Sequence, residues 1–350
     1  MTLTDHTYDF FTQWHLTERC NLSCSHCYQS ENKSEEMPFP EIKKILNEIA
    51  NLIYDWQDTY TVSLSPSLSI TGGEPLLRPD LPLIIDASVQ KGFEVYILSN
   101  GTLISGEMAK TFAALGTKGV QVSIEGPEKI HDSIRGTGSF RSAINGVRNL
   151  LEAGIIVTLN ATLSRLNAGF FMDMVGLASS LGVHMLGFSR LVPSGRGAGL
   201  IDKMLDIGEV KNLYEKIHSI SAGPLKIVSG DPLFGQMDCP GDTVTGAVMT
   251  GGCAAGLSGF TILADGTITP CRRLPVPIGN IRRDSLREIW ATSPVLEQLR
   301  DRTGYKGKCG TCPRWASCRG CRAIAYAYAR GKNNMDYLSE DPQCFIDRSF

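Results

Sequence analysis

Three cysteines near the start of the chain have the spacing of a metal-binding loop. Cys20, Cys24 and Cys27 follow the pattern C-x3-C-x2-C, and Tyr28 comes directly after the third. Three thiolates this close together can bind three irons of a cubane iron–sulfur cluster and leave the fourth iron without a protein ligand. An iron with an open position can bind and activate a small molecule. The alternatives are a zinc ion with His26 as its fourth ligand, and a set of inert buried thiols.

The other cysteines of the chain all lie in its C-terminal third. They are Cys239, Cys253, Cys271, Cys309, Cys312, Cys318, Cys321 and Cys344. Eight thiolates suffice for two complete four-thiolate sites, and with the first three they use all 11 cysteines of the chain. Pairs with C-x2-C spacing are also typical of zinc ribbons, so this block alone leaves zinc and iron–sulfur open. A disulfide framework suits a small secreted domain better than a chain of 350 residues.

Composition and charge describe an ordinary globular protein. Apolar residues make up 42% of the chain and charged residues 20%, and the formal net charge is −2. This charge balance predicts no nucleic-acid partner and no attraction to an anionic membrane. The first residues, Met1 to His6, lack the basic and apolar regions of a signal peptide, and no apolar run is long enough to span a bilayer. Together with the cysteine content, this predicts a cytoplasmic protein whose thiols serve metals.

From residue 13 to about residue 190, runs typical of strands alternate with amphipathic runs typical of helices. The expected strands are Gln13–Glu18, Ser67–Thr71, Glu94–Ser99, Gly119–Ile124, Ile155–Ala161 and His184–Ser189. The expected helices are Phe39–Tyr54, Leu81–Lys91, Ser105–Leu115, Ser139–Ala153 and Asn167–Leu181. This alternation predicts an α/β fold with a parallel sheet, either an open doubly wound sheet or a partial barrel.

Polar or glycine-rich segments follow the C-terminal ends of all six expected strands. They are Cys20–Cys27, Gly72–Pro75, Ser99–Gly101, Ser123–Gly126, Asn160 and Arg190–Pro193. Because ligands of such folds bind at the C-terminal ends of the strands, these segments predict one site on one rim of the sheet. The alternative is that each segment is an ordinary turn.

Three further segments lie between the expected sheet and the C-terminal cysteines. Ser194–Gly199 is rich in glycine and is expected to be a flexible loop. Ile207–Ile220 is expected to be a helix that covers one side of the sheet. Phe260–Leu263 and Thr267–Pro270 flank Asp265-Gly266, which predicts a hairpin that ends at Cys271.

At this point the motifs resemble those of a known superfamily. The cysteine triplet with Tyr28, followed by Gly72-Gly73-Glu74-Pro75, resembles the radical S-adenosylmethionine (SAM) enzymes, and the C-terminal cysteines resemble their SPASM extension. The interval between Cys318 and Cys321 is one residue shorter than the common SPASM form. The resemblance implies a partial (β/α)6 TIM-like barrel over residues 1–200, a helical bridging segment over 201–235, and a SPASM domain with a β-hairpin and short helices over 236–350.

The resemblance also implies roles around the first cluster. Cys20, Cys24 and Cys27 would hold a catalytic [4Fe–4S] cluster whose open iron binds SAM. The implied SAM contacts are Tyr28, Gly72, Gly73 and Glu74, then Ser99, Asn100, Ser123 and Asn160, then Arg135, Leu191 and Val192. Among these, Gly72, Gly73 and Glu74 would meet the amino group. A guanidinium at Arg135 suits the carboxylate, and the backbone of Leu191 and Val192 the adenine. The alternatives are a surface arginine and two plain core residues.

For the C-terminal cysteines the resemblance implies two auxiliary [4Fe–4S] clusters, which makes three clusters in all. Cys309, Cys312, Cys318 and Cys344 would bind one auxiliary cluster. Cys253, Cys271 and Cys321 would bind the other, with Cys239 as its fourth ligand. If Cys239 does not bind, that cluster keeps an open iron that can meet substrate directly.

The implied activity begins with reductive cleavage of SAM to a 5′-deoxyadenosyl radical, and the auxiliary clusters suit a substrate that must also lose an electron. A ribosomally made peptide, crosslinked or otherwise oxidised, is the first candidate substrate. A tetrapyrrole that loses porphyrin propionates is the second. Only nineteen residues precede Cys20, so a peptide substrate is expected to need a separate leader-binding protein, and a flavodoxin or ferredoxin is expected as reductase. A non-catalytic electron carrier or zinc scaffold would have no use for the open triplet.

Overall fold

A strongly curved sheet holds the molecule together. The computed structural model describes residues 7–29, 35–221, 223–237 and 251–346. Its strand order is β10-β9-β8-β1-β2-β3-β4-β5-β6-β7. The first seven strands in the chain are β1 (Thr7–Thr17), β2 (Ser63–Gly72), β3 (Glu94–Ser99), β4 (Gly119–Ser123), β5 (Ile156–Leu163), β6 (Met185–Arg190) and β7 (Lys226–Val228). They pair in parallel, and β7 and β10 end the described sheet without meeting each other. The expected α/β fold with a partial barrel is therefore confirmed, and the sheet is open.

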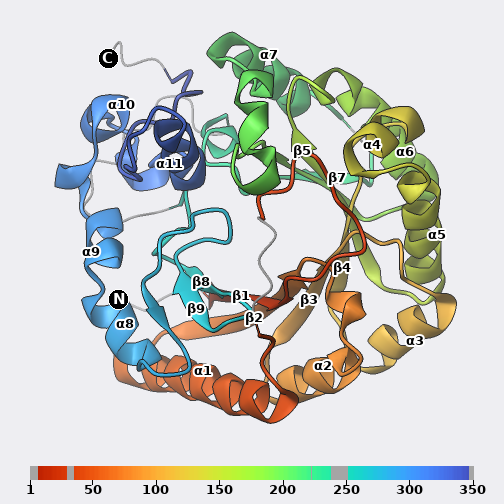
Figure 1. Cartoon of the computed structure of the whole chain (residues 1–350), viewed down its shortest axis with the longest axis horizontal. Coiled ribbons are helices and arrows are strands. Elements are labelled where there is room, and N and C mark those ends of the chain that lie inside the picture. Colours follow the sequence, from red (N-terminus) through yellow and green to blue (C-terminus); the bar gives the residue numbers. More distant parts are fainter. Residues whose placement is uncertain (1–6, 30–34, 222, 238–250, 347–350) are drawn as a thin grey trace.

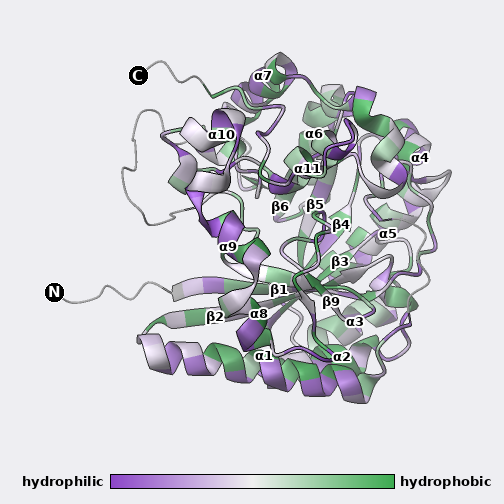
Figure 2. Ribbon diagram, turned by 60° about the vertical axis from the view of Figure 1, so that its left-hand side comes forward, coloured by the Kyte–Doolittle hydropathy of each residue, from purple (hydrophilic) through white to green (hydrophobic). Residues whose placement is uncertain are grey.

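Helices cover the outer face of this sheet (Figure 1). They are α1 (Phe39–Tyr60), α2 (Leu81–Gln90), α3 (Gly106–Ala114), α4 (Glu128–Arg135), α5 (Ser139–Glu152), α6 (Phe171–Leu181) and α7 (Ile207–His218). In α1, Ile42, Ile45, Ile49 and Ile53 recur at helical spacing and are buried. Figure 2 shows the result as alternating hydrophobic and hydrophilic bands along this helix. The apolar stripe faces the sheet, so tertiary burial fixes where α1 lies.

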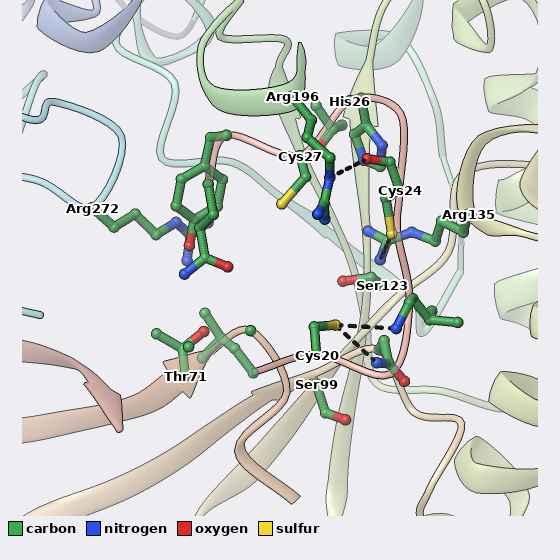
Figure 3. Close-up of a pocket in the computed structure, with 18 of the residues that line it drawn as sticks. Cys20, Cys24, His26, Cys27, Thr71, Ser99, Ser123, Arg135, Arg196 and Arg272 are labelled. Atoms are coloured by element: carbon green, nitrogen blue, oxygen red, sulfur yellow. Dashed lines mark hydrogen bonds between the residues drawn. The ribbon is translucent and has the colours of Figure 1, made fainter. Parts of the chain in front are cut away.

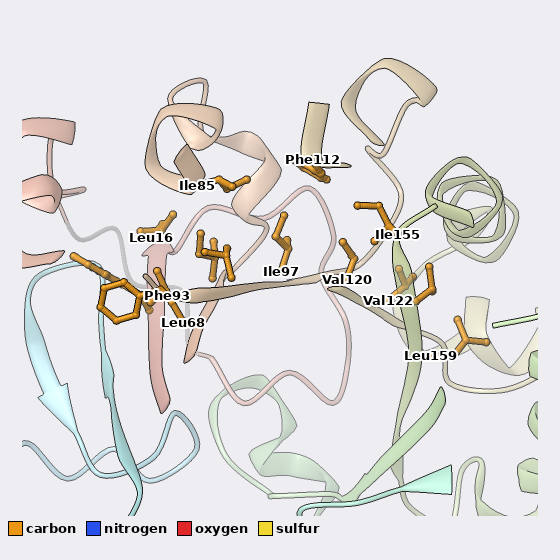
Figure 4. Packing of buried hydrophobic residues seen from close by; sticks show 14 of the residues in the cluster. Leu16, Leu68, Ile85, Phe93, Ile97, Phe112, Val120, Val122, Ile155 and Leu159 are labelled. Atoms are coloured by element: carbon orange, nitrogen blue, oxygen red, sulfur yellow. The ribbon is translucent and has the colours of Figure 1, made fainter. Parts of the chain in front are cut away.

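The alternation of side chains along the strands separates the core from the site. In β3, Val95 and Ile97 are fully buried, whereas Leu98, between Ile97 and Ser99, faces a cavity. In β4, Val120 and Val122 are likewise buried among the residues drawn in Figure 4. Successive strand residues point to opposite faces, so the convex face of the sheet is apolar and its concave face is free for polar groups.

The expected elements agree closely with the structure where a local pattern is strong. The strand Glu94–Ser99 is found with the bounds expected, and the other expected strands and helices are found within a few residues or with longer ends. Helix α4 and strand β7 were not expected. The segment from Ser194 also differs, because Gly195–Lys203 is a 3₁₀ helix and not a flexible loop. A Cβ at Gly195 would lie 2.3 Å from the Tyr28 carbonyl oxygen, so this glycine lets the segment pack directly on the cysteine loop.

The C-terminal region continues the same sheet. Strands β8 (Gly259–Ile262) and β9 (Thr267–Thr269) form the expected hairpin, and β10 (Gly279–Asn280) follows. The hairpin also pairs in parallel with β1 through β8, a contact that the local sequence did not predict. Helices α8 (Leu286–Thr292), α9 (Pro294–Arg300), α10 (Gly307–Thr311) and α11 (Arg322–Arg330) lie beyond it (Figure 1). The boundaries at residues 200 and 235 stay a prediction, and β7 lies inside the segment that was expected to be a helical bridge.

A buried ionic cluster fastens the C-terminal region to the end of β6. The Arg190 guanidinium lies 2.7 Å from a carboxylate oxygen of Asp231 and 2.8 Å from one of Asp341. It also donates to the Gln343 side-chain oxygen over 2.9 Å. Arg190 is 1% exposed, so this charge is compensated entirely by its partners.

Among the helices of the described ranges, none is long and apolar enough to cross a membrane.

Candidate functional site

The first cysteine loop leaves β1 and faces the concave side of the sheet. Backbone hydrogen bonds hold it from two sides, because Ser25 N donates to Ile134 O and Gly197 N donates to Cys27 O, each over 2.9 Å. Cys24 is buried, Cys27 is partly exposed and Cys20 is exposed. Figure 3 shows the three thiols pointing from this one loop toward a common space. These hydrogen bonds therefore fix the shape of the loop.

The thiols line a cavity of about 770 Å³. Nine of the eleven residues expected to contact SAM also line it, namely Tyr28, Gly72, Gly73, Ser99, Asn100, Ser123, Arg135, Asn160 and Val192. Five strands and the cysteine loop thus meet at one rim, as the strand-end rule predicted. The contacts of these residues with SAM remain a prediction.

Glu74 does not line the cavity with its side chain, and its expected backbone contact with SAM stays a prediction. Its carboxylate is fully buried beneath the rim and accepts hydrogen bonds from Asn100 N and Ser99 Oγ, each over 2.8 Å. Burial raises the pKa of Glu74 to about 7, although these hydrogen bonds act to lower it. Through these hydrogen bonds the Glu74 carboxylate holds the turn after β3. This turn carries Asn100, which lines the cavity.

The two glycines before Glu74 are needed for close packing of the backbone. A Cβ at Gly72, whose φ is +145°, would lie 2.2 Å from Thr17 O, and one at Gly73 would lie 2.3 Å from Arg19 O. No side chain fits there, so the rim segment rests against the start of the cysteine loop. Leu191 also lies outside the cavity lining, because it is buried and its backbone N donates to Leu163 O over 2.9 Å. Of the expected adenine pair, only Val192 reaches the cavity.

A charged network supports the cysteine loop from below. Arg135 Nε lies 3.0 Å from Glu125 Oε1, and its Nη1 lies 3.8 Å from Cys24 Sγ. His26 Nε2 lies 3.2 Å from the same Glu125 oxygen, so this ring nitrogen faces a carboxylate. Burial acts to raise the pKa of Glu125, but the charges of Arg135 and His26 hold it well below its ordinary value. Sequence reasoning gave Glu125 no role, although its place just past β4 was a signal for one.

The cavity is also strongly cationic. Five arginines line it, namely Arg19, Arg135, Arg196, Arg272 and Arg273. The last two directly follow Cys271 and reach the cavity from the C-terminal region. No prediction included them, because nothing in the local sequence shows that the hairpin brings Cys271 beside the first cysteine loop.

Four C-terminal thiols lie together in a separate, smaller cavity. Its lining includes Cys309, Cys312, Cys318 and Cys344, the four residues expected to bind one auxiliary cluster. Gly320 N lies 3.4 Å from Cys318 Sγ, and burial raises the pKa of that thiol far above its ordinary value. The donor set and its grouping fit a four-thiolate cluster.

Of the other C-terminal thiols within the described residues, Cys321 and Cys271 pack near the end of β6. Cys321 is buried in a hydrophobic cluster with Leu191 and Leu274, and Cys271 packs against the same cluster. Cys253 lies beside Cys318, because its backbone N donates to Cys318 O over 3.0 Å. Cys239 lies outside the described residues. Within those residues, no three His, Cys, Asp or Glu side chains converge on one metal-ion position, and in a cubane each thiolate binds a different iron at its own corner.

Comparisons with known proteins agree with this arrangement. The model of the radical SAM superfamily matches residues 14–168, and that of the SPASM iron–sulfur cluster-binding domain matches residues 253–322. The AdoMet-dependent heme synthase of Nitratidesulfovibrio vulgaris is 33% identical over 95% of this chain and 90% of its own length. The mycofactocin maturase MftC of Mycobacterium tuberculosis is 31% identical over 95% of this chain and 81% of its own length.

Solved structures show the same fold. Streptococcus suis SuiB bound to S-adenosylmethionine aligns with a TM-score of 0.74 at 18% identity, covering 97% of this chain and 78% of that chain. The structure of anSMEcpe with bound AdoMet aligns with a TM-score of 0.69 at 19% identity, covering 94% of this chain and 93% of that chain. The shared fold therefore extends through the C-terminal region.

Proposed function

We propose, from the premise that this chain belongs to the radical SAM superfamily and carries its SPASM iron–sulfur domain, that it oxidises a ribosomally made peptide. The two sets of thiols are the basis of this proposal. Cys20, Cys24 and Cys27 lie at one wall of the cavity, and Arg272 and Arg273 bring the segment after Cys271 to another. A substrate in this cavity meets both regions at once.

When bound, the cluster and SAM supply a 5′-deoxyadenosyl radical, which removes a hydrogen atom from a substrate carbon. The chain's own residues orient the partners and exclude water. The cavity must hold the cluster, SAM and the reacting group within about 770 Å³. Only one part of a larger substrate fits beside them, such as a side chain or a chain end of a peptide. An auxiliary cluster held by the SPASM thiols would then accept one electron from the substrate radical, which also loses a proton, so that the overall change is a two-electron oxidation and allows a crosslink.

The cluster ligands are proposed as expected, and two of the expected SAM contacts are reassigned as supports of the others. We assign the catalytic cluster to Cys20, Cys24 and Cys27, and the first auxiliary cluster to the four thiols that share the smaller cavity. Cys253, Cys271, Cys321 and Cys239 are proposed for the second auxiliary cluster, giving three [4Fe–4S] clusters. The nine cavity-lining residues named above are proposed as SAM contacts, and Glu74 and Leu191 as their supports.

The peptide class is supported by similarity to MftC, a maturase by its name, along almost the whole chain. The partners proposed with it are a separate leader-binding protein and a flavodoxin or ferredoxin as reductase. The test is mass spectrometry of the precursor peptide encoded beside this gene, after anaerobic incubation with reconstituted enzyme, reductant and SAM. We expect the peptide to lose two hydrogens, and 5′-deoxyadenosine to accumulate in the same tube. An unchanged peptide beside abundant 5′-deoxyadenosine would contradict the peptide proposal.

A tetrapyrrole is the second candidate, and one observation favours it. Three relatives that are 30–33% identical over 95% of this chain are named AdoMet-dependent heme synthase. Removal of porphyrin propionates would also suit a cavity lined by arginines, since a guanidinium pairs well with a carboxylate. The parallel test replaces the peptide with iron coproporphyrin III. Loss of propionate carbon from the porphyrin, dependent on SAM and reductant, would establish this class.

A further inference from the structure

One arginine in the large cavity contacts an aromatic ring rather than a carboxylate. Arg19 is paired with Glu36 over 2.7 Å, and the Arg135 guanidinium is paired with Glu125. For Arg272, no hydrogen bond or ion pair of the guanidinium is found within residues 7–29, 35–221, 223–237 and 251–346. Its charge faces the cavity without an anion from this part of the chain.

The position of Arg272 is set by an aromatic ring. The guanidinium carbon lies 5.8 Å from the centre of the Tyr28 ring, which is a cation–π contact. Tyr28 is held in turn, because its hydroxyl lies 3.4 Å from His15 Nε2. Burial and the charge of Arg272 lower the pKa of His15 to about 3, so this imidazole is neutral and adds no positive charge. The arginine is therefore fixed in place rather than free to turn toward solvent.

A partly buried cation held by a ring alone is incompletely compensated. A cation–π contact replaces only part of the hydration that a guanidinium loses, and the adjacent charge of Arg273 is repulsive. An anion that enters the cavity would relieve both effects.

The SAM carboxylate and the cluster thiolates near Cys271 each have an arginine other than Arg272 nearby. The SAM carboxylate is expected near Arg135, which Figure 3 shows on the opposite side of the cavity from Arg272. The thiolates at Cys271 and Cys321 both act electrostatically on Arg273, whereas of these two only Cys271 acts on Arg272. Arg273 is also tied to the backbone, because its Nη1 donates to Arg190 O over 3.4 Å. Arg272 is left for a third anion.

We propose that Arg272, seated on Tyr28, binds a carboxylate of the substrate and so selects which substrate carbon faces the SAM site. The inference rests on the proposed function, and it adds a recognition group to it. In a peptide the carboxylate comes from the C-terminus or from an Asp or Glu side chain. Both sources offer two oxygens to the planar guanidinium, which can bind them as a pair.

The test compares peptide affinity in three variants of the full, reconstituted protein. Arg272→Gln removes the charge, Arg272→Lys keeps the charge without the fork, and Arg283→Gln is the matched control. Arg283 is exposed and lies 3.7 Å from Asp284. The probe is the precursor peptide with an N-terminal fluorophore, titrated by anisotropy with SAM and without reductant. We expect Arg272→Gln to weaken binding about tenfold or more, Arg272→Lys to weaken it less, and Arg283→Gln to have no effect.

Modified peptides identify the source of the carboxylate. A C-terminal amide and peptides with single Asp→Asn or Glu→Gln changes are titrated against the wild type and Arg272→Gln. One of these changes is expected to weaken binding to the wild type and to have no further effect in Arg272→Gln, because the partner is already absent. 5′-Deoxyadenosine made without peptide is expected to stay within about twofold of wild type in the control Arg283→Gln.

The outcomes separate this inference from the proposed function. Unchanged peptide affinity in Arg272→Gln overturns the inference while leaving the function standing. Loss of iron or of basal 5′-deoxyadenosine in that variant also overturns it, because Arg272 would then support the cofactors. If the wild type binds no peptide, the peptide function falls, and coproporphyrin III and its methyl ester become the probes. Tighter wild-type binding of the free acid, lost in Arg272→Gln, upholds the carboxylate site, and equal binding of acid and ester overturns it.

Discussion

The two cysteine regions use the same side chain in opposite surroundings. Cys20, Cys24 and Cys27 stand on one loop at the wall of a cavity of about 770 Å³. Cys318 and Cys344, in contrast, line a cavity of only about 20 Å³ within the C-terminal region. A thiolate site that faces a large cavity can admit SAM and substrate, whereas an enclosed one can only exchange electrons. We infer that access to a large cavity, rather than the type of ligand, distinguishes the roles of the two cysteine regions.

The two regions also differ in the side chains that surround the sulfurs. The first loop rests on Glu125, Arg135 and His26, a network shared between loop and sheet. In the C-terminal region, Arg322 Nη2 lies 3.5 Å from Cys309 Sγ, and Cys321 N donates to Asp341 over 2.9 Å. Asp341 pairs with Arg190 of β6. The enclosed thiols are thus mechanically linked to the end of a core strand.

Removal of one thiol from the open loop is expected to have the largest effect. Cys24→Ala takes a ligand from the catalytic cluster and should reduce 5′-deoxyadenosine formation by about a hundredfold or more. Chromatography of the products after reduction with dithionite gives the rate. Formation of 5′-deoxyadenosine at the wild-type rate would show that this loop does not hold the reactive cluster.

The same change in the enclosed region should separate SAM cleavage from substrate oxidation. Cys318→Ala removes a proposed auxiliary ligand, so we expect product to fall about tenfold or more while basal 5′-deoxyadenosine continues. Iron content and electron paramagnetic resonance spectra, measured beside product mass, show which cluster is lost. Equal losses of 5′-deoxyadenosine in Cys318→Ala and Cys24→Ala would remove the distinction between the regions.

Breaking the link between the regions should destabilise the fold. Arg190→Met leaves Asp231 and Asp341 as buried, uncompensated carboxylates, and such a change costs about 3–5 kcal/mol of unfolding free energy. The matched control is Arg165→Met, whose partners Asp206 and Glu209 are exposed and whose loss should cost about 1 kcal/mol or less. Urea unfolding of both apo variants measures the difference. Equal midpoints would mean that the ionic cluster does not hold the regions together.

The network under the open loop should make stability depend on pH. The folded-state pKa of Glu125 lies well below its ordinary value of 4.5. Its stabilising contribution is therefore present at neutral pH, and it is lost as the pH falls below about 4.5, where the unfolded chain takes up a proton first. Glu125→Gln should lower the unfolding free energy at pH 7 by about 1–3 kcal/mol and flatten this acid dependence. Glu128→Gln, at an exposed ion pair, should change neither; a wild-type acid slope in Glu125→Gln would exclude the network as its source.

The core elements could be predicted because their patterns are local. In β3, a continuous apolar run from Val95 to Leu98 lies between the polar residues Glu94 and Ser99, so its bounds were expected correctly. Helix α4 was not predicted because the segment Glu128–Arg135 is short and rich in charged residues. Strand β7 was not predicted because a segment of three residues is too short to show a hydrophobic periodicity. Both elements are stabilised by tertiary contacts that local patterns do not record.

Prediction of the site was limited in a similar way. The cysteines and strand-end segments were found by spacing, and most of them line one cavity. The contact of Glu125 with His26 joins residues far apart in the chain, and the approach of Arg272 to Tyr28 depends on the pairing of β8 with β1. Glu74 was expected to offer its backbone to SAM, and its motif does not show that its side chain holds the turn after β3. Long-range packing decides these contacts.

The most direct test of the proposed peptide oxidation follows a single hydrogen atom. Precursor peptide made with deuterated amino acids is incubated anaerobically with the reconstituted protein, reductant and SAM, and both products are analysed by mass spectrometry. The account predicts that 5′-deoxyadenosine gains one deuterium from the peptide and that the unlabelled peptide loses two hydrogens. Abundant 5′-deoxyadenosine without deuterium, beside an unchanged peptide, would contradict it.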